Sequence, residues 1–325
     1  MTAARSRGTS DTRLMVRIAQ MYYRMNLSQE QIGERLGLSR FRVGRLLDRA
    51  LREEIVRIEV VHPDARLVEL EEQLVQRFGL LAAVVADVPA ASGAGMAADD
   101  VARDAVADAA ADFLATRRPA GTIAVSWGRT MLALARRLPA GWTQAREIVQ
   151  VNGATSRSAQ PTRANEIVER FAATSGASIR LLVAPAIVGT PELRTALVED
   201  AGIRETIDVA RHAPTAIFGL GIPAPDSPHL ESGFVSSDEQ ARLRAIGAVG
   251  DIIGRFVDGE GRIAWPLLDE RSVGLPLDDL RTKRLSMGLA AGAGRGPVAL
   301  AAIRGGYVNV LATDDATAAW VLAHG

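Results

Sequence analysis

Apolar residues recur at helical spacing in three short stretches near the start of the chain. The stretches are Leu14–Met25, Gln29–Leu36 and Arg40–Arg52. Ser28 precedes the second stretch, with Gln31 three residues further on, and this capping-box pattern marks the beginning of a helix. Gly37, which can adopt a positive φ, ends that stretch, and Ser39 caps the next one. The pattern predicts three helices, the last two joined by a turn so tight that they must cross steeply.

A predicted strand and a predicted linker helix follow. Apolar and polar residues alternate over Ile55–Val61, which favours a strand that would complete a winged helix-turn-helix, and Pro63 ends it. Arg66–Phe78 is expected to be a helix with a narrow apolar stripe, formed by Leu67, Leu70, Leu74 and Phe78. This stripe suits a short coiled coil between two chains and packing against the C-terminal domain of its own chain equally well.

After residue 80, short apolar runs alternate with amphipathic helices. The predicted strands are Ala82–Ala86, Thr122–Ser126, Glu147–Val151, Ile179–Val183, Thr215–Leu220, Leu285–Ala290 and Val308–Ala312. The predicted helices are Asp99–Ala115, Thr130–Arg137, Pro161–Thr174, Asp238–Gly247, Val298–Ile303 and Asp315–Ala323. Gly93–Ala98 predicts a flexible loop. The alternation is typical of an α/β fold with a mainly parallel sheet that has helices on both faces.

These patterns divide the chain into four segments. We expect a disordered N-terminus over residues 1–12, a helix-turn-helix domain over 13–62, a linker helix over 63–79 and the α/β domain over 80–325. The first twelve residues lack the apolar centre of a signal peptide. No apolar run reaches the roughly 18 residues that a membrane span requires. We therefore expect a cytoplasmic protein with no membrane partner.

The formal net charge of zero conceals an asymmetry along the chain. Residues 1–62 hold 12 arginines against 7 acidic residues, whereas the remainder holds 26 basic and 31 acidic residues. A basic N-terminal domain on an acidic body favours nucleic-acid binding by that domain. The chain contains no cysteine, which excludes disulfides, thiolate metal sites and a cysteine nucleophile, and which suits a reducing cytosol.

The third predicted helix exposes a cationic face. In a helix-turn-helix, the first turn of the recognition helix faces base edges in the major groove, while flanking basic groups hold phosphates. Arg40, Phe41 and Arg42 are therefore the expected base-contacting residues. The alternative, a three-helix bundle with a solvated arginine face, is disfavoured because both caps, the glycine turn and the cationic face occur together. The predicted interface with double-stranded operator DNA comprises Ser28, Gln29, Ser39, Arg40, Phe41, Arg42, Arg45 and Arg49.

Three loops between a predicted strand and the next helix or strand carry groups suited to an anion. Ser126–Thr130 (SWGRT) offers hydroxyls and backbone amides, and Asn152–Thr155 (NGAT) offers an amide, a hydroxyl and a permissive glycine. Gly292–Gly296 (GAGRG) carries Arg295, which can bind a phosphate with two parallel hydrogen bonds. Parallel α/β sheets bind ligands at the carboxyl ends of their strands, where these loops lie. Each loop alone is more often an ordinary turn, but together they favour a small anionic ligand.

Several of these motifs resemble one known family. The segment SQEQIGERLGLSRFRVGRLLDRALREEIVRIEV is similar to the DNA-binding segment of SorC/DeoR-type sugar-binding transcriptional regulators. In the C-terminal part, VSWGRTM, VNGA, GAVGDIIGRFVDGEG and RGGYVNVLATDDATA each resemble a block of that family, in the family's order, so the resemblance covers nearly the whole chain. It implies a Rossmann-like α/β/α effector domain similar to sugar-phosphate isomerases, a homo-oligomer (dimer or tetramer), and a sugar, sugar phosphate or polyol as effector.

The resemblance also implies ligand-binding residues. The SWGRT loop and Arg295 would hold the phosphate of the effector, and Asn152, Gly153 and Asp251 would line its sugar. The family commonly has lysine where Arg295 stands, so the charge is retained while the hydrogen-bonding geometry differs. The predicted set is Ser126, Gly128, Arg129, Thr130, Asn152, Gly153, Ala154, Arg163, Asn165, Asp251 and Arg295.

The alternative function on such a scaffold is catalysis, as in a sugar-phosphate isomerase or deaminase. That chemistry needs a general base, often with a histidine or lysine partner. None of the histidines (His62, His212, His229 and His324) lies in the three loops, and the only lysine, Lys283, falls in a charged stretch that we expect to be solvated.

No spacing of metal ligands is recognisable, and we expect neither a metal nor an organic cofactor. The sequence therefore predicts a transcriptional regulator of a carbohydrate or polyol catabolic operon rather than an enzyme. As a repressor, it would release its operator when a small phosphorylated sugar binds.

Overall fold

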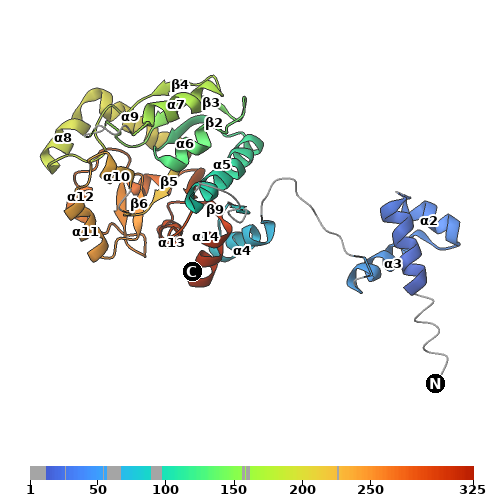
Figure 1. Ribbon diagram of the computed structural model, residues 1–325. Helices are drawn as coiled ribbons and strands as arrows, with labels where there is room; N and C mark the ends of the chain where they lie inside the picture. Colours follow the sequence, from blue (N-terminus) through green and yellow to red (C-terminus); the bar gives the residue numbers. More distant parts are fainter. Residues whose placement is uncertain are drawn as a thin grey trace. The chain divides into compact units, whose positions relative to one another are not determined.

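The computed structural model describes residues 12–25, 27–53, 55–56, 67–88, 97–155, 158, 162–224 and 227–325 (Figure 1). The chain divides into two compact units, Met1–Pro63 and Asp64–Gly325, and each has an apolar core of its own. In the described residues, no helix combines the length and the apolar character needed to cross a membrane.

The first unit contains a helix-turn-helix. Residues 12–19 are helical, and Gln20–Arg24 (η1) continue as a π-helical turn. Helices α2 (Gln29–Leu36) and α3 (Arg40–Arg52) have the bounds that the sequence predicts. Their apolar faces meet in a small core whose fully buried members are Ile18, Ile32 and Val43. Because these side chains come from all three helical segments, burying them fixes how the segments pack.

The turn between α2 and α3 depends on two glycines. Gly37 has φ of 66°, a left-handed conformation that glycine adopts without steric cost, and it ends α2. Gly33 lies inside α2, and a Cβ atom at this position would come within 2.5 Å of the carbonyl oxygen of Leu38. The backbone of the turn can therefore approach α2 closely only where a side chain is missing.

Three predictions at the edges of this unit and in the following loop fall largely outside the described residues. Of the strand expected at Ile55–Val61, Ile55 and Val56 form a bend, and residues 57–61 are not described, so the wing remains a prediction. Thr12, expected to be disordered, is already helical, and residues 1–11 are not described. Of the loop expected at Gly93–Ala98, Ala98 begins a helix and residues 93–96 are not described.

The second unit is built on a parallel sheet. Its strands are β1 (Ala82–Ala86), β2 (Ala120–Val125), β3 (Gln144–Gln150), β4 (Ser178–Arg180), β5 (Thr215–Gly221), β8 (Leu285–Ala290) and β9 (Val310–Asp314). The strand order is β1-β9-β8-β5-β2-β3-β4, and every neighbouring pair in it is parallel. A short antiparallel hairpin, β6 (Gly250–Ile252) and β7 (Arg255–Val257), extends from the end of β5.

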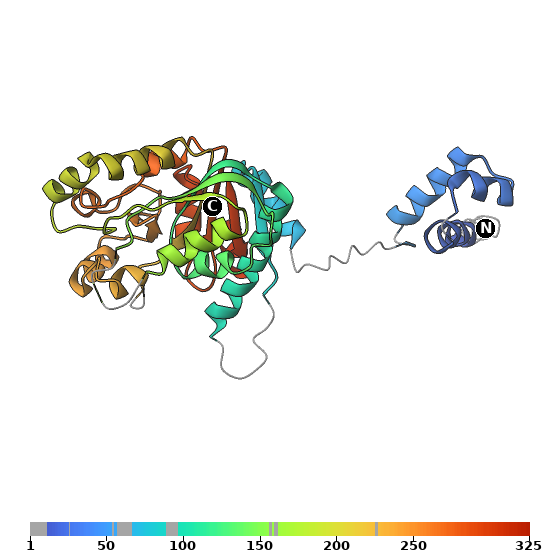
Figure 2. The same cartoon turned by 90° about the horizontal axis from the view of Figure 1, so that it is seen from above.

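Helices cover both faces of this sheet, as Figures 1 and 2 show. One apolar cluster includes α5 (Ala98–Arg117), α6 (Arg129–Ala135) and α7 (Ala164–Ala173). The other includes α4 (Val68–Phe78), α9 (Ala201–His212), α13 (Gly296–Arg304) and α14 (Asp315–His324). Successive residues of a strand join opposite clusters: Val84 belongs to the first and Val85 to the second. The fold is the α/β/α arrangement that the alternating sequence pattern predicts.

The apolar stripe of α4 is buried within the second unit. Leu74 has no exposed surface, and Leu67, Leu70 and Phe78 pack against the same cluster as α13 and α14. The carboxylate of Glu71, buried on the same helix, accepts a hydrogen bond of 2.8 Å from the backbone N–H of Val85 in β1. Of the two alternatives for this stripe, the described contacts therefore correspond to packing against the chain's own domain.

Candidate functional site

The exposed face of α3 is the first candidate site. Arg40, Phe41, Arg42 and Arg45 are exposed, and 83% of the surface of Phe41 is accessible. The opposite face of α3 is anchored in the core by Val43, Leu47 and Ala50, each of them buried. The face that α3 turns away from the core therefore carries three arginines and one aromatic side chain, the types of group that contact DNA.

The other four residues of the predicted interface have structural contacts. The Ser28 hydroxyl accepts a hydrogen bond from the Gln31 backbone N–H at 3.2 Å, and the Ser28 N–H donates to Oε1 of Gln31 at 3.0 Å, so the expected capping box is formed. The Ser39 hydroxyl accepts from the Arg42 N–H at 3.3 Å. Arg49 pairs with Glu53 at 2.7 Å. Gln29 is half-buried with its side-chain amide against Gly44.

A cavity of about 500 Å³ in the second unit is the second candidate site. The strand order reverses between β2 and β5, because the sheet continues from β2 to β3 and β4 on one side and from β5 to β8 and β9 on the other. Such a reversal leaves a crevice at the carboxyl ends of the strands. The cavity lies there, between residues that follow β2 (Trp127–Met131) and residues that end and follow β5 (Gly219–Ile222).

Five of the eleven predicted ligand-binding residues line this cavity. They are Gly128, Arg129, Thr130, Asp251 and Arg295. Ser126 is buried at the end of β2, where its hydroxyl accepts a hydrogen bond of 3.3 Å from the backbone N–H of Gly219 and so ties β2 to β5. The structure thus brings the SWGRT loop, Asp251 and the GAGRG loop together from segments far apart in the sequence.

The NGAT loop lies behind this wall and does not line the cavity. Asn152 is buried, and the carbonyl of Gly153 accepts a hydrogen bond of 2.9 Å from the indole N–H of Trp127, which does line the cavity. The hydrogen bond between Trp127 and Gly153 therefore helps to position the cavity wall. Ala154, Arg163 and Asn165 line a different cavity of about 350 Å³, where Arg163 pairs with Glu166 at 2.5 Å.

His229 is a cavity residue that the sequence analysis missed. It lies in the four-residue helix α10 (Pro228–Glu231), and its Nε2 is 3.1 Å from Oδ2 of Asp251. Oδ2 also accepts from the backbone N–H of Gly254 at 3.2 Å. None of the three candidate loops contains a histidine, but the fold brings His229 to the same cavity. Ser227 and Pro228, a helix-start pattern that follows a predicted strand, could have indicated a helix carrying His229 at this end of the sheet.

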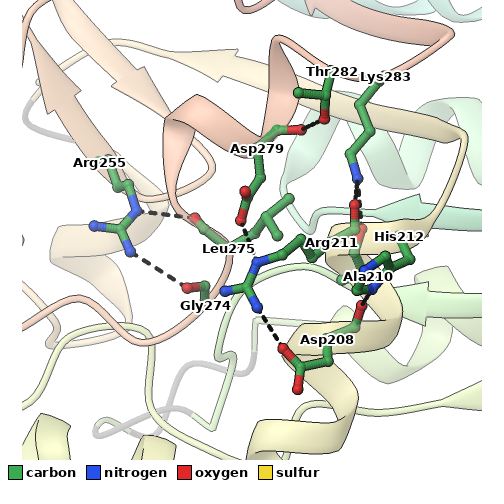
Figure 3. Close-up of polar contacts among 10 residues, drawn as sticks. All are labelled: Asp208, Ala210, Arg211, His212, Arg255, Gly274, Leu275, Asp279, Thr282 and Lys283. Carbon is green, nitrogen blue, oxygen red and sulfur yellow. Dashed lines mark hydrogen bonds and ion pairs between the residues drawn. The ribbon is translucent and has the colours of Figure 1, made fainter.

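The expectation that Lys283 is solvated is also wrong. Only 5% of its surface is accessible, and its ammonium group donates to the backbone carbonyls of Ala210 at 2.7 Å and Arg211 at 2.5 Å, at the end of α9 (Figure 3). Burial lowers the pKa of Lys283 to about 8. Asp279 raises this pKa and Arg211 lowers it further, but both effects are smaller than that of burial. Lys283 therefore caps a helix away from the cavity, whose lining does not include it.

The charges around the cavity are balanced in pairs. Its lining includes three arginines and three aspartates: Arg103, Arg129, Arg295, Asp99, Asp100 and Asp251. Arg295 lies 3.4 Å from Asp99, Arg103 lies 2.5 Å from Asp100, and Arg129 lies 3.8 Å from Glu231. Within the described part of the chain, no group of three or more histidine or acidic residues is arranged to hold a metal ion.

Known proteins resemble this chain over both units. A family model described as "Putative sugar-binding domain" matches residues 62–323, and a model of sigma-70 region 4 matches residues 17–53. The deoxyribonucleoside regulator of Bacillus subtilis (strain 168) is 31% identical over 306 residues, which is 94% of this chain and 96% of that protein. The sorbitol operon regulator of Klebsiella pneumoniae is 30% identical over 319 residues, 97% and 99% of the two chains.

The likeness extends to three dimensions. The crystal structure of the full-length sorbitol operon regulator SorC from Klebsiella pneumoniae matches with a TM-score of 0.68 and 29% identity, over 96% of this chain and 99% of that one. Fold and matches together define a class of protein in which an N-terminal helix-turn-helix is joined to a sugar-binding domain. The chain belongs to the SorC/DeoR family of sugar-binding transcriptional regulators.

Proposed function

We propose that this protein is a DNA-binding regulator of a carbohydrate or polyol catabolic operon, and that a small phosphorylated sugar in the cavity of the second unit controls its binding to the operator. The observation that carries the proposal is the joint presence of an exposed cationic α3 in one unit and a polar cavity at the strand reversal in the other. Operators with two-fold symmetry call for a paired protein, so the active form in this proposal is a homodimer or homotetramer.

The chemistry of the cavity supports a ligand with both an anionic end and hydroxyl groups. Arg129, Thr130 and Arg295 supply guanidinium and hydroxyl donors to the cavity lining. Asp251 supplies an acceptor for sugar hydroxyls, and its contact with His229 fixes the orientation of the carboxylate. A cavity of about 500 Å³ has the size of ordinary small-molecule sites.

The test of this proposal separates effector binding from DNA binding. In thermal-shift measurements with a set of sugar phosphates, a ligand that binds only the folded chain raises its unfolding temperature. Arg295→Ala should remove that rise while leaving operator affinity intact, because Arg295 lies in the second unit, outside the helix-turn-helix. Arg262→Ala is the matched control, because Arg262 is an exposed arginine of the same unit that pairs with Asp258 at 3.1 Å and does not line the cavity. Loss of DNA binding in Arg295→Ala would count against a sensor role.

One observation favours a second candidate, an isomerase-like enzyme on the same scaffold. The His229–Asp251 pair orients an imidazole at the cavity wall, and such a pair can act as a general base. Incubating the protein with each stabilising sugar phosphate and analysing the products distinguishes the two functions, because a regulator returns its ligand unchanged whereas an enzyme converts it.

A further inference from the structure

A carboxylate of the chain itself occupies the loop that carries Arg295. Asp99, in the first turn of α5, accepts a hydrogen bond at its Oδ1 from the backbone N–H of Ala293 at 3.0 Å. Its Oδ2 lies 3.4 Å from Nη1 of Arg295. A Cβ atom on Gly292 would come within 2.8 Å of this carboxylate, so the loop approaches Asp99 closely where it has no side chain. One carboxylate thus engages a backbone amide and a guanidinium, the two kinds of donor that bind phosphate.

A second carboxylate at this loop has a different role. Asp314 accepts from the Gly292 N–H at 2.7 Å and from the Thr317 N–H at 2.8 Å, so it holds the loop and caps α14 at once. Asp314 is 3% exposed, whereas 42% of the Asp99 side chain is accessible. A partly exposed ion pair contributes little to stability, while a buried carboxylate with two backbone donors is costly to remove. Of the two, Asp99 is the carboxylate that an incoming anion can replace.

We propose that Asp99 is a specificity-determining residue of the cavity, which competes as an internal anion for the Ala293 amide and Arg295. This inference rests on the anionic effector of the proposed function. A phosphate group carries more charge than a carboxylate and more acceptor oxygens, so it can displace Asp99 from both donors. An uncharged polyol has no anionic group that could replace Asp99 at these two donors, so it gains nothing from removal of the Asp99 charge.

The test uses the full-length chain and inorganic phosphate as the probe, with binding measured by calorimetry. Asp99→Asn keeps the shape of the side chain and removes the charge that competes for Arg295. It should lower the dissociation constant for phosphate about two- to fivefold, the range expected when a partly exposed ion pair no longer has to be broken. Asp99→Ser removes the same charge and also shortens the side chain, so it should act in the same direction. Sorbitol, an uncharged probe, should gain no affinity from Asp99→Asn, and a gain equal to that of phosphate would overturn the inference.

Asp100→Asn is the matched control, because Asp100 lies in the same helical turn, lines the same cavity and pairs with Arg103 instead of Arg295. An equal gain in Asp100→Asn would mean that general charge, and not competition at Arg295, is responsible, and would overturn the inference. An unchanged or weaker affinity in both Asp99 variants would overturn it as well.

Arg295→Ala separates the failure of this inference from that of the proposed function. If Arg295→Ala weakens phosphate binding while the Asp99 variants do not strengthen it, only the role of Asp99 is wrong. If phosphate binding is undetectable in all these chains, or if Arg295→Ala does not change phosphate affinity, then the anionic site itself is wrong and so is the role of Asp99.

Discussion

Arg42 lies in the first turn of α3, exposed, with its backbone N–H held by the Ser39 hydroxyl. A side chain in this position of a recognition helix reaches base edges, and a two-pronged contact to a guanine discriminates by about 1–3 kcal/mol. Arg42→Ala should therefore reduce the preference for the operator over other sequences by that amount. Band-shift titrations at fixed salt against the operator and a scrambled duplex measure the difference.

Arg35→Ala, an exposed arginine in the last turn of α2, serves as the control for this substitution. If Arg35 touches DNA at all, it would touch phosphates, and its loss would weaken binding to both duplexes equally. Equal weakening of both duplexes by Arg42→Ala would show that Arg42 reads no base.

Lys283 gives the unfolding free energy a dependence on pH. Its pKa is lowered by burial from 10.5 to about 8, so between these values the unfolded chain holds a proton that the folded chain has released. Stability rises with pH wherever the unfolded state binds more protons, and the contribution of Lys283 should therefore increase from about pH 8 to about pH 10.5. The neutral amine retains N–H donors for the two carbonyls at the end of α9.

Urea unfolding at pH 8 and pH 10 checks this, with Lys283→Met as the reference that lacks the titrating group. The stability of the parent chain relative to Lys283→Met should be greater at pH 10. A difference that stays constant with pH would show that the buried amine titrates normally.

His229 and Lys283 also show what a sequence can say about single residues. The exposed face of α3 was predictable, because an amphipathic helix fixes which side chains point outward through its own periodicity. The positions of His229 and Lys283 depend on distant partners, Asp251 in β6 and the carbonyls at the end of α9. No local pattern records such contacts, so the sequence analysis missed His229 at the cavity and wrongly expected Lys283 to be solvated.

Among the elements, the β6–β7 hairpin carries Asp251 and is held by Arg255. Arg255 is buried, its Nη1 lies 2.6 Å from Oδ1 of Asp269, and its Nε donates to the carbonyl of Leu275 at 3.0 Å. Figure 3 shows the contacts of Arg255 with the backbone at Gly274 and Leu275. Arg255→Met should lower the free energy of unfolding by about 3–5 kcal/mol, because it strands a carboxylate and buried carbonyls without their donor.

Denaturant titration followed by circular dichroism measures this loss. Arg262→Met removes an ion pair whose arginine side chain is 75% exposed and should cost no more than about 1 kcal/mol. A cost for Arg255→Met as small as that of the control would mean that the hairpin is held by something other than Arg255.

Some elements with strong local signals were predictable to the residue, but α9 was missed although Asp200 caps its start. Caps at Ser28, Gly37 and Ser39 set the bounds of α2 and α3. Helix α8 (Pro191–Glu199) has no fully buried residue, only Leu197 and Val198 partly buried against a small apolar cluster, so its pattern is weak, although Thr190 and Pro191 form a recognisable start. β6 and β7 have three residues each, too few for alternation to be seen.

For the molecule as a whole, alternation of strands and helices predicted a parallel sheet with both faces covered, and the structure confirms it. The expectation that parallel sheets bind ligands at the carboxyl ends of their strands correctly placed two of the three candidate loops at one cavity. It failed for the third, because the loop after β3 is separated from the cavity by Trp127, whose indole bonds to Gly153. The order of strands in a sheet, which decides such neighbourhoods, is set by long-range pairing that no short pattern encodes.

The proposed regulation requires that effector binding in the second unit changes operator binding by the first, and operator affinity measured at equilibrium shows whether it does. Operator affinity is titrated at fixed salt with and without a sugar phosphate that stabilises the full-length chain. An allosteric coupling of ordinary strength should weaken operator binding about fivefold or more in the presence of the ligand. Operator affinity that does not change when a ligand occupies the cavity, or a chain that prefers no DNA sequence over any other, would show that the protein is not an effector-controlled regulator.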